Sequence, residues 1–237
     1  MARRYATRFA ENSEDVSAAQ TLRGLAFRGG QDDLDDFDKS CIHVLIEDRQ
    51  ELRTAGAFRI QPFENGSEIS RSYAAQFYEL SALKSYPGKL VEMGRFCIDP
   101  RYNDPDILRS AWAAMTAYVD AHNVKMLFGC SSFHGAEAEA HLEAFALLKA
   151  RHLAPRKYLP KIKAPKVFPF ARLMRKPDMT AAQRAMPPLL RTYLMMGGWT
   201  SDHAVIDRDL DTVHVFTGLE IGAIPVGRKR LLRAAVG

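Results

Sequence analysis

Apolar side chains recur along this chain with two periods, which separate the expected helices from the expected strands. From Val16 to Ala26 they follow the 3.6-residue period of a helix, with Ser13 suited to cap its start and Gly29-Gly30 to end it. Asp104-Pro105 combines a capping carboxylate with a proline at the first helical position, and predicts the start of a longer helix. Further helices are expected over residues 136–149 and 187–196.

Shorter apolar runs bounded by turn residues predict strands. The strands are expected at residues 5–10, 41–47, 53–60, 90–98, 125–130 and 212–216, while residues 77–83 fit either a strand or a helix. The order strand, helix, strands, helix, strand, helix predicts an α/β fold with a mostly antiparallel sheet at its beginning.

The composition is typical of one sizeable globular domain. The chain has 237 residues, of which 47% are hydrophobic. It contains no run of about 18 apolar residues and its first residues lack the apolar core of a signal peptide, so we expect a cytoplasmic protein. Cys41, Cys97 and Cys130 lie far apart within apolar runs, which suits reduced thiols. Neither Cys-x-x-Cys nor His-Glu-x-x-His spacing occurs, so no metal site is expected.

Basic residues are unevenly distributed in a chain of net charge +5. Residues 156–176 hold eight of them, Lys161, Lys163 and Lys166 included, without one acid, and residues 228–233 hold four more. This asymmetry favours an acidic partner, namely a carrier protein, an anionic membrane surface or nucleic acid, although a solvated face has the same composition. No helix-turn-helix, aromatic platform or zinc-finger pattern is present, so nucleic acid is the least favoured of the three.

The expected strand at residues 90–98 carries two charges within an apolar segment. Glu92 and Arg95 are three positions apart, and the two-residue period of a strand directs them to opposite faces unless a bulge at Gly94 intervenes. Charged groups are rarely buried without partners. With the acidic residues at positions 32–38 upstream, the strand indicates a site for a cationic substrate with a base beside it.

These residues and their order resemble the GNAT acyltransferase fold. Arg23-x-x-x-Phe27, Asp33-x-Asp35-x-x-Asp38, Arg59 and Glu92-x-x-Arg95-Phe96 look like the signature of acyl-homoserine-lactone synthases. Residues 128–133, His152-Leu153-Ala154-Pro155 and the segment from Pro187 to Tyr193 resemble instead a sister group, the ornithine N-acyltransferases that make lyso-ornithine lipid. This resemblance covers nearly the whole chain. It implies a GNAT-like core over residues 1–155, with residues 156–237 as a basic extension packed on that core.

The resemblance implies transfer of a 3-hydroxyacyl chain from acyl carrier protein to the α-amine of L-ornithine. Residues 99–105, where many GNAT enzymes have a glycine-rich loop for coenzyme A, contain no glycine, which favours the phosphopantetheine arm of a carrier protein and no bound cofactor. The next tryptophan after Phe27 is Trp112, whereas the lactone synthases have one soon after the corresponding motif. Glutamine or another amino acid as acceptor, an acyl-homoserine-lactone synthase, and a non-enzymatic module that binds carrier protein or membrane remain alternatives.

Each site residue carries an expected role in that reaction. Glu92 is the expected base for the amine, with substrate orientation or a structural ion pair as alternatives. Asp35 and Asp38 are expected to hold the ammonium groups of the acceptor. The alternative is that the acidic segment is an ordinary solvated loop with no role in binding. The α-carboxylate of the acceptor is assigned to Arg23, Arg59 or Arg95, and Phe27 to a wall of the site or to the core. Peripheral contact with the inner membrane is left open for the basic segment.

Overall fold

The computed structural model describes residues 3–234, which fall into two compact units. The first unit holds the chain up to Pro62, Met93–Val124 and the segment from Val226 onward; the second holds Phe63–Glu92 and Lys125–Pro225. The strand β5 (Leu90–Ile98) therefore contributes its first three residues to the second unit and the others to the first. Its bounds are those expected from the sequence.

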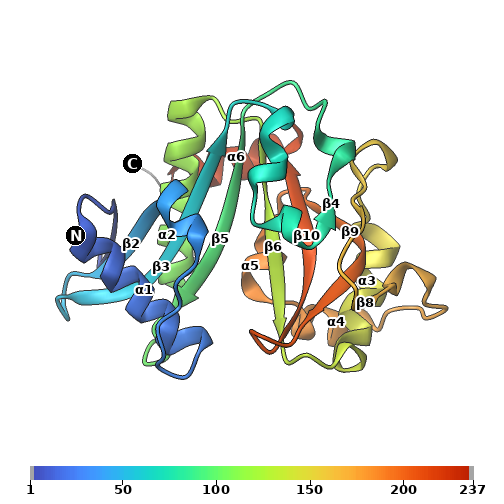
Figure 1. The fold of residues 1–237 in the computed structure, drawn as a ribbon, viewed down its shortest axis with the longest axis horizontal. Helices are drawn as coiled ribbons and strands as arrows, with labels where there is room; N and C mark the ends of the chain where they lie inside the picture. Colours follow the sequence, from blue (N-terminus) through green and yellow to red (C-terminus); the bar gives the residue numbers. More distant parts are fainter. Residues whose placement is uncertain (1–2, 235–237) are drawn as a thin grey trace. The chain divides into compact units, whose positions relative to one another are not determined.

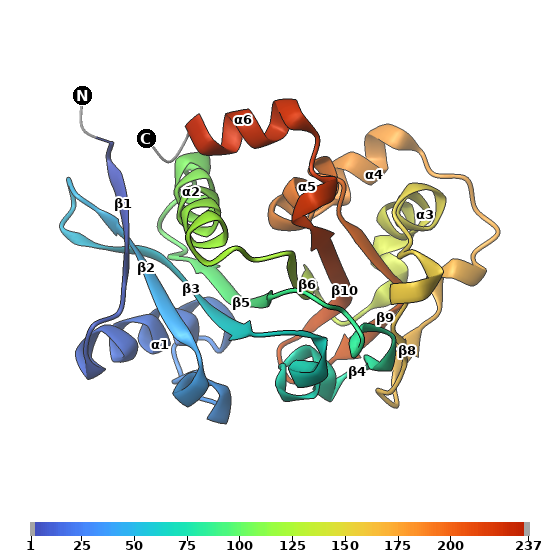
Figure 2. The ribbon, with the colours of Figure 1, turned by 90° about the horizontal axis from the view of Figure 1, so that it is seen from above.

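Four strands of the first unit lie in the order β1-β2-β3-β5. Besides β5, these are β1 (Tyr5–Phe9), β2 (Ile42–Asp48) and β3 (Arg53–Phe63). β1 pairs antiparallel with β2, and β2 pairs antiparallel with β3. The helix α1 (Ser13–Phe27) covers one face of these strands, and α2 (Pro105–His122) covers the other (Figure 2). Between α1 and the strands, Ala19, Leu22, Leu45, Ala57 and Cys97 form a buried apolar cluster.

The ends of α1 and α2 show how local chemistry sets their bounds. Asn12, not Ser13, caps α1, because its side chain accepts a hydrogen bond from the backbone N–H of Asp15. Gly29 and Gly30 follow with φ of +59° and +97°, the left-handed conformation that ends many helices. Asp104 caps α2, as expected.

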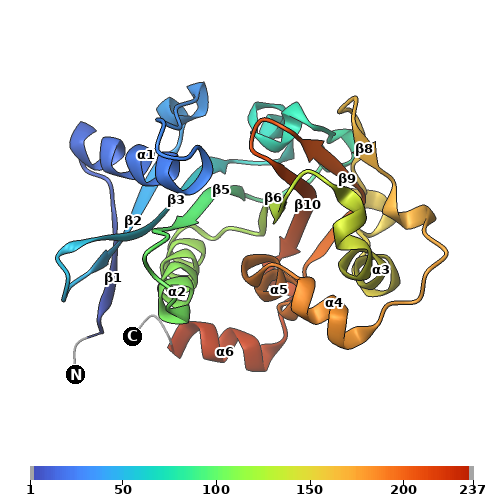
Figure 3. The same ribbon diagram turned by 90° about the horizontal axis from the view of Figure 1, so that it is seen from below.

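The helix α6 (Val226–Ala234) was not expected from the apolar pattern. None of its residues is buried, so no apolar stripe marks it in the sequence. It lies next to α2 in the first unit (Figures 2 and 3), where Arg233 donates two hydrogen bonds to Asp120 at 2.8 and 3.0 Å.

The strands of the second unit lie in the order β5-β6-β10-β9-β8. Their bounds are β6 (Met126–His134), β8 (Val167–Phe168), β9 (Trp199–Asp207) and β10 (Thr212–Glu220), and a small second sheet pairs β4 (Tyr78–Glu79) with β7 (Lys161–Ile162). β5 and β6 are parallel over Leu90–Glu92, whereas β6/β10, β10/β9 and β9/β8 are antiparallel. β9 and β10 come from residues 156–237, the expected extension.

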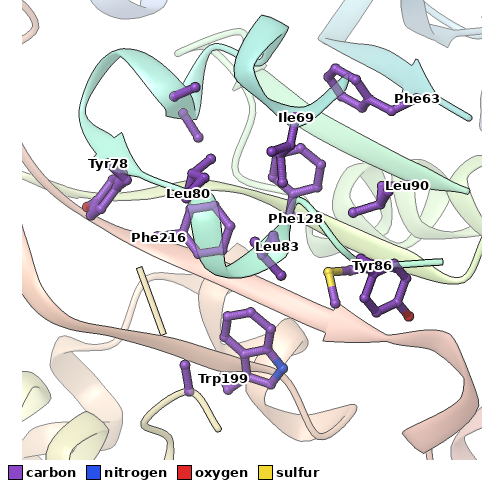
Figure 4. Close-up of a cluster of buried hydrophobic side chains, with 14 of the residues drawn as sticks. Phe63, Ile69, Tyr78, Leu80, Leu83, Tyr86, Leu90, Phe128, Trp199 and Phe216 are labelled. Carbon is purple, nitrogen blue, oxygen red and sulfur yellow. The ribbon is translucent and has the colours of Figure 1, made fainter. Parts of the chain in front are cut away.

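Two apolar clusters cover the two faces of these strands. On one face lie α3 (Leu142–Arg151), α4 (Met179–Ala185) and α5 (Pro188–Met195), packed on Phe133, Val213 and Val215 (Figure 3). On the other face residues 66–83 bring Ile69, Tyr78 and Leu80 against Phe128 and Phe216 (Figure 4). The helix expected at residues 136–149 begins only at Leu142, since a 3₁₀ turn at Ala138–His141 precedes it.

Short 3₁₀ turns account for much of the remaining chain (Figure 1). They are η1 (Asp36–Ser40), η2 (Gly66–Arg71), η3 (Ala74–Gln76), η4 (Ser81–Leu83), η5 (Ala138–His141), η6 (Arg156–Tyr158), η7 (Phe170–Arg172) and η8 (Ile221–Ala223). Among the helices of residues 3–234, none is both long and apolar enough to cross a membrane.

Candidate functional site

Five of the expected site residues meet in the first unit, in one network of aspartates and arginines. Arg23 comes from α1, Arg59 from β3 and Arg95 from β5, while Asp35 and Asp38 come from the acidic segment after α1. That segment is an extended loop ending in η1, where Asp35 and Asp38 cap the turn reciprocally with their side chains.

Asp33 and Asp38 form the buried part of this network. Arg23 donates from Nε to Asp33 at 2.8 Å and from Nη1 to Asp38 at 2.6 Å. Asp33 also accepts a hydrogen bond from Nε of Arg28 at 2.9 Å, and its Oδ2 lies 2.9 Å from Nε of Arg95. The side chains of Arg23, Asp33 and Asp38 are 1%, 0% and 7% exposed, so each charge is neutralised by protein rather than by water.

Asp35 is the most exposed carboxylate of the network. Its side chain is 20% exposed, and Arg59 grips it with two nitrogens, at 2.5 and 2.7 Å. Arg95 adds a third bond from Nη2 at 3.2 Å. The two-pronged contact fixes the plane of the carboxylate, and its outer edge remains accessible to a ligand.

The network holds its carboxylates in the ionised form. Burial by itself raises the pKa of Asp38, but the hydrogen bonds from Arg23, Gln20 and Arg59 outweigh it and leave the pKa well below the ordinary value. The same balance of burial against Arg95, Arg28 and Arg23 lowers the pKa of Asp33.

Arg95 takes part at a cost in backbone conformation. Its φ is +51°, in the left-handed region that side-chain-bearing residues rarely adopt. The irregularity anticipated at Gly94 therefore falls on Arg95 itself. It lets β5 turn the guanidinium toward Asp33 and Asp35, and the two ion pairs stabilise a backbone that costs about 1–2 kcal/mol.

Phe27, at the end of α1, is half-buried. Its ring packs against the apolar cluster of the first unit that contains Leu22 and Leu45. This position fits the alternative noted for Phe27, a side chain of the core.

Glu92 lies in the second unit, where two backbone N–H groups donate to its carboxylate. It is 4% exposed, and its two oxygens accept the backbone N–H groups of Tyr73 and Ala74, both at 2.7 Å. These groups come from the start of η3, so a short turn presents two neighbouring donors to one carboxylate. The two N–H groups thereby fix the position of the carboxylate.

Tyr193 of α5 is a buried group near enough to Glu92 to feel its charge, and sequence reasoning did not assign it to the site. Burial raises the pKa of its phenol above the ordinary value, and the charge of Glu92 raises it further. Tyr193 belongs to a motif of the expected family, so a signal for it existed. The N–H donors of Tyr73 and Ala74 carry none, because a backbone group looks the same in every residue.

Lys161, Lys163 and Lys166 of the basic segment are all exposed, and Lys163 also has a backbone partner. Lys163 donates from Nζ to the carbonyl oxygen of Ala75 at 2.6 Å. A cavity of about 500 Å³ lies elsewhere, in the first unit, lined among others by Arg4, Arg53 and Arg101.

Comparison with known proteins identifies the class first. Residues 19–113 match the model of the acetyltransferase (GNAT) domain. FeeM, an N-acyl amino acid synthase from uncultured soil microbes, superposes with a TM-score of 0.54 at 11% identity, over 92% of this chain and 93% of that one. The coenzyme A-dependent acyl-homoserine lactone synthase BjaI superposes with a TM-score of 0.50 at 12% identity, over 98% and 89%. The fold is therefore the GNAT acyltransferase fold, with a mixed, mostly antiparallel sheet, as expected.

Sequence relatives define the family within that class. The L-ornithine N(alpha)-acyltransferase of Rhodobacter capsulatus is 31% identical over 239 residues, which span 93% of this chain and 91% of the relative. The enzyme of the same name from Brucella abortus is also 31% identical, over 92% and 84%. The chain belongs to the family of these L-ornithine N(alpha)-acyltransferases and is an acyltransferase.

Proposed function

We propose that this protein transfers an acyl chain from a thioester to the α-amine of L-ornithine. The observation that carries the proposal is the 31% identity to an enzyme of that name across 93% of this chain. In the reaction the amine nitrogen bonds to the thioester carbonyl carbon, the carbon–sulfur bond breaks, and the amine proton leaves. The products are an N-acyl amino acid and a free thiol.

The proposed donor is a 3-hydroxyacyl chain on the phosphopantetheine arm of acyl carrier protein, with no bound cofactor. Residues 99–105 hold no glycine, and the first turn of α2 is capped by the carboxylate of Asp104, which accepts from the N–H of Asp106 at 2.9 Å. Because the capping carboxylate is negatively charged like a phosphate, it disfavours the binding of a pyrophosphate at this helix start. A donor anchored by its carrier protein needs less from this loop. BjaI uses coenzyme A in a related fold, so the fold alone does not select the donor.

Glu92 is the proposed base for the amine. Its carboxylate is buried and fixed by two N–H groups, and a carboxylate oxygen has more than one lone pair to accept with. Such a group can take a proton from an amine held within hydrogen-bond reach. The competing role is purely positional, with Glu92 tying the turn at residues 73–76 to β5.

Asp35 is the proposed contact for the side-chain ammonium of the acceptor. It is the most exposed carboxylate of the buried network, at 20%, while Asp38 is 7% exposed. Asp38 has the same proposed preference for a cation, but its oxygens are bound by Arg23, Arg59 and Gln20. The arginines of the network, Arg59 and Arg95 foremost, are proposed to face the α-carboxylate.

One assay with two panels of substrates tests the function. Purified protein is given 3-hydroxyacyl carrier protein with ornithine, lysine, glutamine or S-adenosylmethionine, and products are read by mass spectrometry. The same acyl group on coenzyme A replaces the carrier protein in the second panel. We expect ornithine and the carrier protein to give the highest kcat/KM. Preferred turnover of S-adenosylmethionine to a lactone, or of glutamine, would replace the proposed acceptor, and equal use of both donors would remove the carrier protein.

We also propose a peripheral contact with an anionic membrane, through α6. This helix exposes Arg228, Arg230 and Leu231, the last at 65%, and the segment from residue 221 to 234 has no acid. Each exposed cation is worth about 1 kcal/mol at an anionic surface. The protein should sediment together with phosphatidylglycerol vesicles, and the double variant Arg228→Glu with Arg230→Glu should stay in the supernatant. Equal sedimentation of both proteins, or binding to phosphatidylcholine alone, contradicts this contact.

A further inference from the structure

We propose that Lys163 is a positioning residue for Glu92, since its ammonium group holds the turn whose backbone N–H groups bind the Glu92 carboxylate. The proposal rests on the role in the reaction proposed above for Glu92. It gives one lysine of the basic segment a task other than the recognition of an acidic partner.

Three contacts join the turn to the segment that carries Lys163. Nζ of Lys163 donates to the carbonyl oxygen of Ala75 at 2.6 Å. The backbone N–H of Ala164 donates to the carbonyl of Phe77 at 3.0 Å. Beyond it, β7 pairs with β4, with Ile162 opposite Tyr78. Residues 75–79 are thus bonded to residues 161–164, in the same unit as Glu92.

The bond from Lys163 lies closest to the donors that Glu92 uses. Tyr73 and Ala74 give their N–H groups to the carboxylate, and Ala75, the next residue, gives its carbonyl to Lys163. Ala75 is 9% exposed, so water has little access to that residue, while Lys163 reaches it from the surface. Removing the ammonium leaves the carbonyl to find another partner, which requires the turn to shift.

A shift of this turn moves Glu92, because both carboxylate oxygens follow the two N–H groups. Misplacing a reacting group by about 1 Å can cost about 10²-fold in rate. The turn keeps its other supports, including Ser72, whose Oγ accepts from the N–H of Ala75 at 3.2 Å. We therefore expect a partial loss, of about tenfold in kcat, rather than an inactive enzyme.

The first part of the experiment tests the geometry without reference to activity. Lys163→Met keeps the length of the side chain and removes the ammonium, and Lys161→Met is the matched control on the neighbouring β7 position. Hydrogen–deuterium exchange of peptides covering residues 70–77 should speed up in Lys163→Met and stay unchanged in Lys161→Met. Protection equal to wild type in Lys163→Met overturns the proposal.

The second part tests the consequence for the reaction. Lys163→Met should lower kcat about tenfold and leave the KM of both substrates unchanged, whereas Lys163→Arg, which can still donate to Ala75, should recover most of the rate. In the Glu92→Gln background, Lys163→Met should have no further effect, because the two residues act as one unit. Additive losses, or a change confined to the KM of the carrier protein, overturn the positioning role and leave the proposed function standing. Wild-type activity of Glu92→Gln removes the base role of Glu92 and, with it, the positioning role of Lys163.

Discussion

The acid–arginine network of the first unit and the Glu92 clamp of the second hold buried carboxylates in two different ways. In the network, Asp33, Asp35 and Asp38 are matched by Arg23, Arg28, Arg59 and Arg95, so charge is held by charge. At the clamp, Glu92 is held by the N–H groups of Tyr73 and Ala74. The guanidinium partners hold the pKa values of Asp33 and Asp38 below the ordinary value, whereas the two peptide N–H groups fix the position of the Glu92 carboxylate. The expected site residues therefore divide into an ion-pair network that stabilises the fold and a carboxylate, Glu92, that is proposed to take part in the reaction.

The largest expected effect separates these parts at Glu92. Glu92→Gln should lower kcat by about 10²–10⁴-fold, the usual contribution of a general base, with the fold retained. Because a glutamine NH₂ opposes one of the two N–H donors, Glu92→Asp is a second variant that keeps the charge. Steady-state kinetics with a thermal unfolding curve for each variant provide the measurement. Turnover within a few-fold of wild type in a folded Glu92→Gln protein excludes the base.

The second prediction concerns stability in the network. Asp38→Asn removes one charge from a buried set and leaves Arg23 and Arg59 partly uncompensated, so the free energy of unfolding should fall by about 3–5 kcal/mol. Asp35→Asn, at the exposed edge, should cost less in stability and instead raise the KM for the amino acid. Urea unfolding and kinetics on both variants decide this. Equal destabilisation by the two, with no change in KM, would leave Asp35 without a substrate role.

The third prediction is a dependence of stability on acid pH. The pKa values of Asp33 and Asp38 are lowered in the fold, so protons bind more tightly to the unfolded chain, whose aspartates titrate near pH ~3.9. Their stabilisation is complete above that pH and is lost as the pH falls toward the folded-state values. The free energy of unfolding should therefore decline below pH ~4 more steeply in wild type than in Asp38→Asn. Parallel curves for the two proteins would contradict the lowered pKa of Asp38.

The smallest expected effect belongs to the exposed lysines. Lys161→Glu with Lys166→Glu should raise the KM for acylated carrier protein by about threefold at low salt, with an effect that fades at high salt and an unchanged KM for ornithine. Lys163 stays as it is in this variant, because its reversal would break the bond to Ala75 as well. If the KM for the carrier protein changes with neither the charge reversal nor the ionic strength, this surface is an ordinary solvated one that does not bind the carrier protein.

The sequence predicted best the elements whose signals are local. The bounds of β5, the cap of α2 and the glycine end of α1 were correct, because each depends on a few adjacent residues. β9 was missed, since Thr200, Ser201 and His203 are buried there and its apolar pattern is broken. α6 was missed for the opposite reason, having no buried side chain.

The candidate site was predicted as a set of residues but not as a set of contacts. The resemblance to a family signature identified Arg23, Asp35, Asp38, Arg59 and Arg95 as members, and the structure brings these five together. That aspartates would bind arginines of the same chain could not be read from spacing, because a ligand and a neighbouring side chain offer the same charge. The support of Glu92 comes from peptide groups, which no residue type reveals.

The left-handed backbone of Arg95 also limits how this position can change over many generations. Glycine would suit its φ of +51° but would remove both ion pairs, to Asp33 and Asp35. A β-branched residue would suit neither demand. Few single substitutions at position 95 therefore satisfy both the backbone conformation and the ion pairs. A library that randomises this codon should return arginine almost alone among folded, active clones.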